Sequence, residues 1–342
     1  MRPRRLNAFV NFSANQRYGF EPMTRHLTVD ALFARHVKRL ELEWISSRDA
    51  GSRVLEADES MPWPANLVGH MNLVRPHQVQ VVGRSETEYL EALEETEARR
   101  VCIALIESRP ACIILAGKHP APKALVSTAC AAGAGVALLS SPVASATVVQ
   151  AFQHDLARRF ARRHTVHGVF IEVMGVGVLI TGDAGIGKSE LALELISRGH
   201  RLVADDSPDF YLTAPGILEG ACPPALQDFM EVRGLGIVNV RELFGDGSVK
   251  RDRNLGLVIR LEVLDEAGLM PEERLEGIRR VREILDVTVP EYTLPVAPGR
   301  NLSVLVECTV RNHLLLKKGY DAAKQFSDRQ HREMHSDSEA KG

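Results

Sequence analysis

Hydrophobic and polar positions in the first half of the chain alternate between short apolar runs and segments of helical spacing. The runs VQVVG (79–83), VCIALI (101–106) and ACIILAG (111–117) predict buried strands. SETEYLEALEETEARR (85–100) opens on a serine cap and has a glutamate in its first turn, which predicts a helix. This alternation is typical of an α/β domain with a parallel sheet.

The segment 124–149 contains no charged residue. Its length alone would suit a membrane span. It consists mostly of alanine, serine, glycine and threonine, however, and Pro142 lies inside it. We therefore expect a helix, a strand at 135–139 and a second helix entered through Ser141 and Pro142, with no membrane span.

The second half of the chain has a different pattern. HGVFIEVMGVGVLITG (167–182) contains two β-branched runs that break at Met174 and Gly175, which predicts a hairpin. KSELALELISRGH (188–200) then predicts a helix, and HRLVADD (200–206) another strand. From about Lys324 the chain becomes polar and loses its periodicity, which predicts a frayed tail.

Composition and charge narrow the class of protein. The 342 residues suffice for two ordinary domains, and 45% hydrophobic with 25% charged residues is typical of a soluble globular protein. The net charge of −2 favours neither nucleic acid nor an anionic membrane as a partner. Five cysteines without C-x-x-C spacing argue against a disulfide framework or a zinc site and favour a reducing cytoplasm. The basic N-terminus lacks the apolar run of a signal peptide.

The stretch TGDAGIGKSE (181–190) carries the clearest chemical signal, because it matches G-x-x-x-x-G-K-[ST]. The matching residues are Gly182, Asp183, Ala184, Gly185, Ile186, Gly187, Lys188 and Ser189. Glycines let such a loop turn its N–H groups inward, and a helix N-terminus adds partial positive charge. We expect Lys188 to reach the β- and γ-phosphates of a nucleotide and Ser189 to hold Mg²⁺. The predicted strand, loop, helix and strand are the context that this motif requires.

Asp205 and Asp206 end the predicted strand that follows, only about one helix after the loop. Two adjacent carboxylates can divide two tasks: one binds metal or its waters, and the other takes a proton from an incoming hydroxyl. A pair that only caps a helix or forms a turn is the alternative. The chain has no N-K-x-D, H-R-D or D-F-G, which argues against a Ras-type GTPase and a common protein kinase.

Several blocks in order, between residues 165 and 301, resemble bacterial HPr kinase/phosphorylase. They are TVHGVFIEVMGVGVLITGDAGIGKSE, RGHRLVADD, MEVRGLGIVNVRELFG and PVAPGRN. EVRGLGIVNV is the most specific block, because it corresponds to no general nucleotide-binding pattern, whereas VVGRSETEYLEAL resembles the family's N-terminal domain only loosely. The resemblance implies an N-terminal α/β domain followed by a P-loop kinase domain of the HPr kinase/phosphoenolpyruvate carboxykinase type. The expected segments are an extension (1–24), a regulatory or structural domain (25–155), the catalytic domain (156–325) and a polar tail (326–342).

The resemblance also implies two opposed activities. Such an enzyme phosphorylates a serine of HPr, a phosphocarrier of the sugar phosphotransferase system, with ATP. It removes the phosphate by phosphorolysis with inorganic phosphate, which gives pyrophosphate. The family is Mg²⁺-dependent and typically hexameric, so we expect Mg²⁺ as cofactor, HPr as partner and a homohexamer.

The resemblance assigns roles to individual residues. His167 matches the active-site histidine, although a histidine buried before a strand is the alternative. Lys188 matches the catalytic lysine, and Asp206 the carboxylate that accepts the serine proton and returns it in reverse, with Asp205 in reserve. The Mg²⁺ positions match Ser189 and Glu231.

The basic residues downstream match less directly. The family has an active-site arginine in a Y-[DE]-R-L setting, for which Arg274 in EERLE is the best candidate. The aromatic residue is missing here and the spacing is stretched, so Arg279 and Arg280 are alternatives. Arg300 lies in VAPGR, the segment linked to the dephosphorylating direction.

Two other functions stay open from the sequence. One is a P-loop small-molecule kinase of the phosphoenolpyruvate carboxykinase type, which the short distance between loop and aspartate pair would also suit. EVRGLGIVNV counts against it. The other is a non-catalytic, nucleotide-controlled regulator with the first half as its effector. Lys188, Ser189 and the aspartate pair argue against that function.

Overall fold

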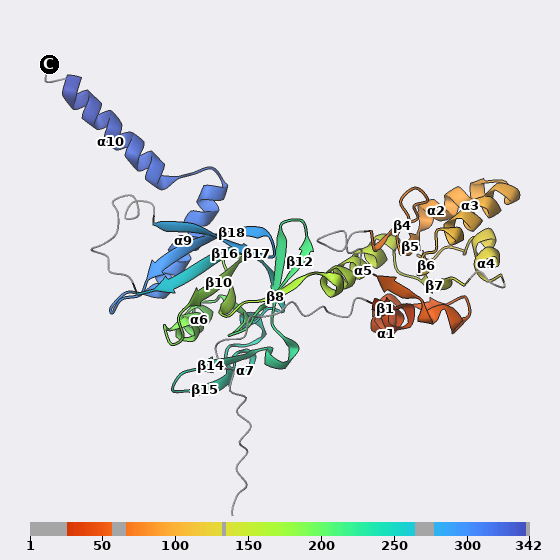
Figure 1. Ribbon diagram of the computed structural model, residues 1–342, viewed down its shortest axis with the longest axis horizontal. Coiled ribbons are helices and arrows are strands. Elements are labelled where there is room, and N and C mark those ends of the chain that lie inside the picture. The colour runs from red at the N-terminus through yellow and green to blue at the C-terminus, as the bar shows by residue number, and fades with distance from the viewer. Residues whose placement is uncertain (1–25, 57–65, 132–134, 264–276, 340–342) are drawn as a thin grey trace, which may run out of the picture.

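The computed structural model describes residues 26–56, 66–131, 135–263 and 277–339. Two sheets, each with its own core, lie on either side of helix α5 (Ser145–Phe160), as Figure 1 shows. The predicted domain boundary between residues 155 and 156 falls inside this helix. Arg274 and the predicted extension 1–24 lie outside the described residues.

Five strands of the described chain form the N-terminal sheet in the order β2-β7-β6-β5-β4. Their bounds are Glu43–Trp44 for β2, Val68–His70 for β4, Val79–Val82 for β5, Cys112–Ala116 for β6 and Ala137–Ser141 for β7. Strands β4 to β7 are parallel and β2 is antiparallel. A small antiparallel pair, β1 (His26–Thr28) with β3 (Val54–Glu56), and the short 3₁₀ helix η1 (Arg48–Ser52) complete this part of the chain.

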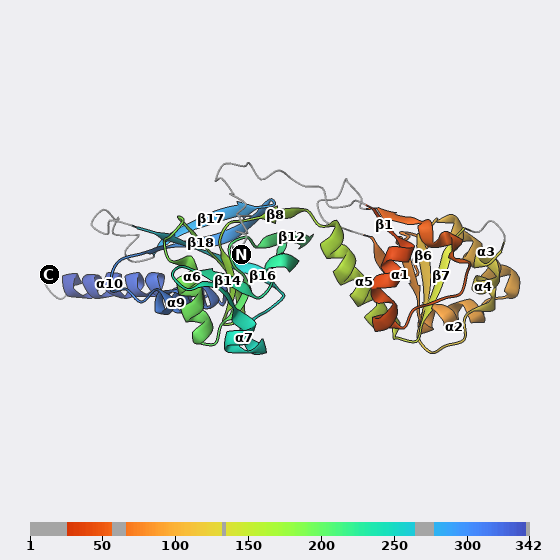
Figure 2. The same ribbon diagram turned by 90° about the horizontal axis from the view of Figure 1, so that it is seen from below.

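Helices cover both faces of the N-terminal sheet, because its strands are apolar on both sides. α1 (Val29–Leu40) and α5 bury Leu32 and Phe152 against one face. α2 (Arg84–Ala92), α3 (Glu95–Glu107) and α4 (Lys123–Ala129) bury residues such as Leu90 and Leu105 against the other. Figure 2 shows the two helix layers with the sheet between them. The predicted parallel α/β domain is confirmed.

The uncharged segment forms α4, β7 and α5 in that order, as predicted. None of the helices that the structure describes is long and apolar enough to cross a bilayer.

The predicted strand 101–106 is wrong, because VCIALI continues α3. Its Cys102 and Leu105 are fully buried while Ile103 faces solvent, which is one apolar face of a helix. A run of six apolar residues fits a buried strand and a buried helix face equally well. The single helix predicted over 85–100 is divided in two, since Leu93 has extended backbone between α2 and α3.

The second sheet contains nine strands of the described chain, in the order β11-β9-β10-β16-β13-β12-β8, with β18 beside β16 and β17 beside β18. The bounds are β8 Arg163–Thr165, β9 Val169–Val173, β10 Val176–Gly182, β11 Arg201–Ala204, β12 Asp209–Ala214, β13 Ile217–Ala221, β16 Asp252–Glu262, β17 Ile278–Ile284 and β18 Val287–Pro295. β9 and β10 form the predicted hairpin, and β10 runs parallel to β16.

Helices α6 (Lys188–Ser197) and α9 (Leu302–Lys317) pack on one face of this sheet through Leu195 and Val306. Strands β12 and β13 contribute Phe210 and Leu218 to the core on the other face. The strands β14 (Phe229–Val232) and β15 (Gly236–Asn239) form a separate hairpin that leads into α7 (Val240–Phe244). Short 3₁₀ turns, η2 (Pro224–Leu226) and η3 (Asp246–Ser248), flank this region.

The polar C-terminal segment is helical rather than frayed. α10 (Ala322–Glu339) extends away from the sheets in Figure 1. The carboxylate of Asp321 accepts hydrogen bonds from the N–H groups of Ala323 and Lys324 at 3.0 and 3.2 Å and so caps the helix. The prediction of a frayed tail was wrong because this helix consists of polar helix-forming residues without an apolar stripe. Hydrophobic periodicity cannot detect such a helix.

Candidate active site

The glycine-rich loop joins β10 to α6, and its backbone requires glycine. Gly182 has φ 145° and Gly187 has φ 101°, both outside the range of ordinary L-residues. A Cβ on Gly182 would lie 2.6 Å from the carbonyl oxygen of Leu261 on β16. Close contact between β10 and β16 therefore fixes where the loop begins.

Lys188, the first residue of α6, is buried over this loop. Its Nζ donates to the carbonyl oxygens of Gly182 at 2.9 Å and Asp183 at 3.0 Å, which holds the ammonium inside the turn. Gly187 precedes the helix and offers no capping side chain. The N-terminus of α6 and Lys188 thus line the same cavity, an arrangement suited to phosphate.

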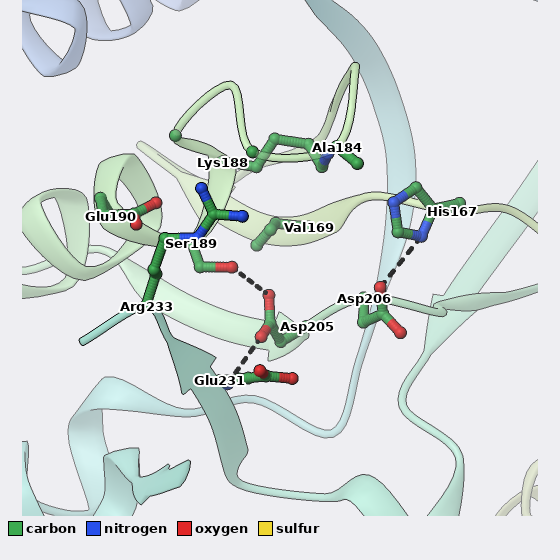
Figure 3. A pocket seen from close by; sticks show the side chains of 12 residues that line it. His167, Val169, Ala184, Lys188, Ser189, Glu190, Asp205, Asp206, Glu231 and Arg233 are labelled. Atoms are coloured by element: carbon green, nitrogen blue, oxygen red, sulfur yellow. Dashed lines mark hydrogen bonds and ion pairs between the residues drawn. The ribbon is translucent and has the colours of Figure 1, made fainter. Parts of the chain in front are cut away.

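Asp205 follows β11 and is buried beneath the loop. Its Oδ1 accepts from the Ser189 hydroxyl at 3.3 Å, and its Oδ2 accepts from the backbone N–H of Glu231 at 3.0 Å (Figure 3). Burial raises the pKa of the Asp205 carboxyl, the Glu231 hydrogen bond opposes this, and the charge of Asp206 adds to it. Asp205 therefore holds the two predicted Mg²⁺ residues in place.

Asp206 points the other way, toward solvent. Its φ of 67° is left-handed, a conformation that aspartate tolerates better than most residues. The N–H of Gly168 donates to its carbonyl at 2.8 Å, and His167 Nδ1 lies 2.9 Å from Oδ1. The side chains of His167 and Asp206 are 51% and 66% exposed. The alternative of a buried core histidine at 167 is therefore wrong.

These side chains line one cavity of about 300 Å³. It brings together six residues named from the sequence, which are His167, Lys188, Ser189, Asp205, Asp206 and Glu231. Of the predicted loop residues, Ala184, Gly185 and Gly187 also line it, whereas Gly182, Asp183 and Ile186 do not. Figure 3 shows the His167–Asp206 pair on one side and the Ser189–Asp205–Glu231 group on the other. His167 precedes β9, the loop follows β10, the two aspartates follow β11, and Glu231 lies on β14.

The described residues that line this cavity do not include the candidate arginines Arg279, Arg280 and Arg300. Arg279 lies on β17, where its Nη1 is 3.8 Å from an Asp321 carboxylate oxygen and its guanidinium is 5.9 Å from the centre of the Tyr292 ring. The assignment of the active-site arginine stays a prediction.

Arg233 lines the cavity and was not selected from the sequence. A Cβ on Gly185 would lie 3.2 Å from Arg233 Nη1, so the guanidinium packs on the loop. A signal existed: Arg233 is two residues after Glu231 in the EVRGLGIVNV block, and it lies in the turn that follows β14. A guanidinium beside a phosphate-binding loop is suited to bidentate contact with phosphate oxygens.

Comparisons with known proteins cover most of the chain. The family model of the HPr Serine kinase C-terminal domain matches residues 158–330, and that of the HPr Serine kinase N terminus matches 27–156. The HPr kinase/phosphorylase of Stenotrophomonas maltophilia strain R551-3 is 43% identical over 305 residues, which are 89% of this chain and 96% of the relative. That of Xylella fastidiosa strain M12 is 40% identical over the same shares.

One solved structure is also similar in sequence, the HPr(Ser) kinase/phosphatase from Coxiella burnetii. It is 40% identical, covers 48% of this chain and 98% of its own, and superposes with a TM-score of 0.44.

Proposed function

The chain belongs to the HPr kinase/phosphorylase family, and from this premise we propose that it phosphorylates a serine of HPr with ATP and removes the phosphate with inorganic phosphate. One observation carries this proposal: Asp205 and Asp206 are adjacent, yet they face opposite directions. Asp205 is buried against Ser189, while Asp206 is exposed at the cavity and paired with His167. The inward carboxylate suits metal and phosphate positioning, and the outward one suits a hydroxyl that arrives on another protein.

In the kinase direction, Asp206 acts as the base. A serine hydroxyl is a weak nucleophile at neutral pH and needs a placed proton acceptor. As the serine oxygen bonds to the γ-phosphorus, the bond from that phosphorus to the ADP oxygen breaks and the serine proton passes to Asp206. His167 orients the accepting carboxylate through its 2.9 Å contact.

In the phosphorylase direction, the same groups act in reverse. An oxygen of inorganic phosphate attacks the phosphorus of phosphoserine, the bond to the serine oxygen breaks, and Asp206 returns its proton to that oxygen. The products are serine and pyrophosphate. Two anions must approach each other, so Lys188, Arg233 and the N-terminus of α6 lower the repulsion.

Mg²⁺ fits the donors at the Ser189 end of the cavity. Asp205 holds the Ser189 hydroxyl and the backbone of Glu231 next to each other, and oxygen ligands are those that Mg²⁺ prefers. Within the described residues no group of three or more His, Cys, Asp or Glu side chains is arranged for a metal. We therefore propose that Ser189 and Glu231 hold the ion together with water and substrate phosphate oxygens. Bound there, it would offset phosphate charge.

We further propose a homohexamer in the cytoplasm. Exposed apolar side chains gather on the β14–β15 hairpin and α7, which supports an assembly surface near the active site; they include Phe229, Leu235, Ile237 and Leu243. Light scattering on the purified full-length chain measures the oligomeric state. A monomer at micromolar concentration would contradict this proposal.

The decisive experiment is a phosphate-dependent assay of pyrophosphate release from serine-phosphorylated HPr, run beside ATP-dependent phosphorylation of HPr. We expect both activities in the full-length chain. We expect Asp206→Asn to lose both, and the exposed control Asp246→Asn to keep them. Turnover of a small molecule with no activity on HPr would favour the carboxykinase-type function. ATP binding without any transfer would favour the regulator.

A further inference from the structure

A buried carboxylate at the other end of the catalytic strands holds three cations. Glu172 on β9 is almost fully buried. Its Oε1 accepts from Arg201 Nε at 2.8 Å, and its Oε2 accepts from Lys250 Nζ at 3.0 Å. Arg253 Nε lies 3.0 Å from the same Oε2. We call these four residues the Glu172 cluster.

The fold brings Arg253 to this carboxylate across a glycine. Glu172 pairs with Gly177 on β10, and a Cβ on Gly177 would lie 3.1 Å from Arg253 Cγ. The missing side chain lets Arg253 cross β10 from β16 to β9. Arg253 Nη2 also donates to the carbonyl oxygen of Gly175 in the hairpin turn. This arginine is therefore held at two points.

Lys250 and Arg201 are fixed by backbone pairing. Arg201 begins β11 and pairs directly with Glu172 on β9. The N–H of Lys250 donates to the carbonyl oxygen of Leu202 at 2.7 Å, so the lysine lies beside the same strand. Backbone hydrogen bonds to and along the sheet thus place all three cations beside Glu172.

The charges in the Glu172 cluster do not balance. Three cations surround one carboxylate, which leaves a net charge of two positive. Burial would raise the pKa of Glu172, but hydrogen bonds from Lys250 and Arg201 outweigh it and lower the pKa, so the carboxylate is ionised at neutral pH. Within the part of the chain that the structure describes, no second carboxylate contacts Arg201, Lys250 or Arg253.

The three cationic side chains are also partly open to solvent. The side chains of Arg201, Lys250 and Arg253 are 43%, 28% and 35% exposed. Two guanidinium groups and an ammonium present the fork-shaped and point donors that bind tetrahedral oxyanions. A ligand with two negative charges would neutralise the excess.

We propose that the Glu172 cluster is a second anion-binding site that takes a phosphate group, either as free orthophosphate or as a phosphate monoester. It is separate from the active site, because none of its four residues lines the cavity at the loop. Gly177, opposite Glu172, lies near the start of β10, and the loop follows the other end of that strand. The site does not depend on the proposed reaction.

The test measures phosphate affinity in full-length protein that carries Lys188→Ala, which weakens binding at the loop. We expect isothermal titration calorimetry with orthophosphate, at an ionic strength fixed with chloride, still to detect binding to this protein. In the same protein, adding Lys250→Gln should raise the Kd for orthophosphate by about tenfold, because one charge-assisted contact is lost. Adding Lys318→Gln, an exposed lysine at the end of α9, should leave it unchanged.

Further variants and ligands sharpen this test. Arg253→Gln should weaken binding as Lys250→Gln does, and Lys250→Arg should preserve it, with circular dichroism confirming the fold of each. Glycerol 2-phosphate forms the second ligand arm: binding of both ligands indicates recognition of any phosphate group, and binding of orthophosphate alone indicates the free ion. Equal affinity in the Lys250→Gln, Arg253→Gln and Lys318→Gln proteins would overturn the proposal.

Discussion

Two strand–loop–helix units in this molecule share a framework and differ in chemistry. In the catalytic domain β10 leads through the glycine-rich loop into α6, and in the N-terminal domain β6 leads through residues 117–122 into α4. Both strands have parallel neighbours, both helices begin with a lysine, and neither helix has a side-chain cap. The cavity beside the catalytic loop measures about 300 Å³, and that beside the N-terminal loop about 60 Å³.

The difference lies in the backbone donors of the two loops. The N-terminal loop reads GKHPAP, and its prolines at 120 and 122 have no N–H group to offer. The catalytic loop has glycines at 182, 185 and 187, all with positive φ, and no proline. The end of a parallel strand thus provides space for a ligand, and the backbone N–H groups of the following loop determine whether phosphate can bind there.

The largest expected effect separates the two helix-opening lysines. Lys188 is buried in its loop and Lys123 is exposed. Lys188→Ala should lower the rate of HPr phosphorylation by about 100- to 1000-fold, since it removes the charge that we propose faces the transferred phosphoryl group. Lys123→Ala should change the rate less than about twofold. Steady-state kinetics with ATP and HPr measure both, and a comparable loss in Lys123→Ala would break the comparison.

The next effect concerns the first glycine of each loop. Alanine at Gly182 would place its Cβ 2.6 Å from a backbone oxygen, so Gly182→Ala should lower the free energy of unfolding by about 2–3 kcal/mol. At Gly117 the nearest atom is His119 Cδ2 at 3.0 Å, and this side chain can move. Gly117→Ala should therefore cost about 1–2 kcal/mol. Urea unfolding monitored by circular dichroism measures both, and the reverse order would contradict the role given to the β10–β16 contact.

Local patterns predicted the parts of the site that are local in sequence. The loop, the β9–β10 hairpin and the strand before Asp205 follow from residue order and periodicity alone. The opposite orientation of the two aspartates, on which their proposed roles rest, does not, because it depends on the left-handed backbone at Asp206 and its hydrogen bond from Gly168. Those features arise only once β9 and β11 pair.

Arg233 was missed for the same kind of reason. It reaches the cavity because the β14–β15 hairpin folds against the loop, a contact between segments more than forty residues apart. The helical nature of 101–106 depends likewise on what that segment packs against, whereas α10 is a polar helix capped by Asp321. Periodicity is uninformative in a short apolar run and in a uniformly polar segment.

A smaller kinetic effect compares the side chains that lie over each loop. Arg233 packs on Gly185, and His119 lies nearest to Gly117. Arg233→Gln should lower pyrophosphate release by about 10- to 30-fold, because it removes the charge-assisted contact to phosphate that we propose for this guanidinium. His119→Gln should leave the rate unchanged. The assay on serine-phosphorylated HPr measures both rates, and full activity in Arg233→Gln would show that the guanidinium only packs on the loop.

The two domains also join helices through the same kind of ion-pair cluster, in which one carboxylate binds an arginine and a histidine. In the N-terminal domain the Asp155 carboxylate on α5 binds Arg35 and His36 on α1. In the catalytic domain Glu307 on α9 binds Arg198 and His200, which follow α6. Hydrogen bonds from His36 and Arg35 outweigh burial and lower the pKa of Asp155. The bond from Arg198 lowers the pKa of Glu307 to about 2. The domains therefore resemble each other in stabilisation more than in chemistry.

The smallest predicted effect is the contribution of these two ion-pair clusters to the free energy of unfolding, which depends on pH. A carboxylate whose folded pKa is depressed contributes stability above its unfolded pKa, about 4.3 for glutamate, and loses it as pH falls toward the folded value. Glu307→Gln should therefore lower the free energy of unfolding by about 1 kcal/mol at pH 7, after allowance for solvent screening, and by progressively less from pH 4.5 toward pH 2. Asp155→Asn should show the same convergence in the transition of the N-terminal domain, because its carboxylate is depressed in the same direction. Urea unfolding at several pH values measures both differences. A Glu307→Gln difference that stays constant down to pH 3 would show that packing of the side chain, and not its ionisation, joins α6 to α9.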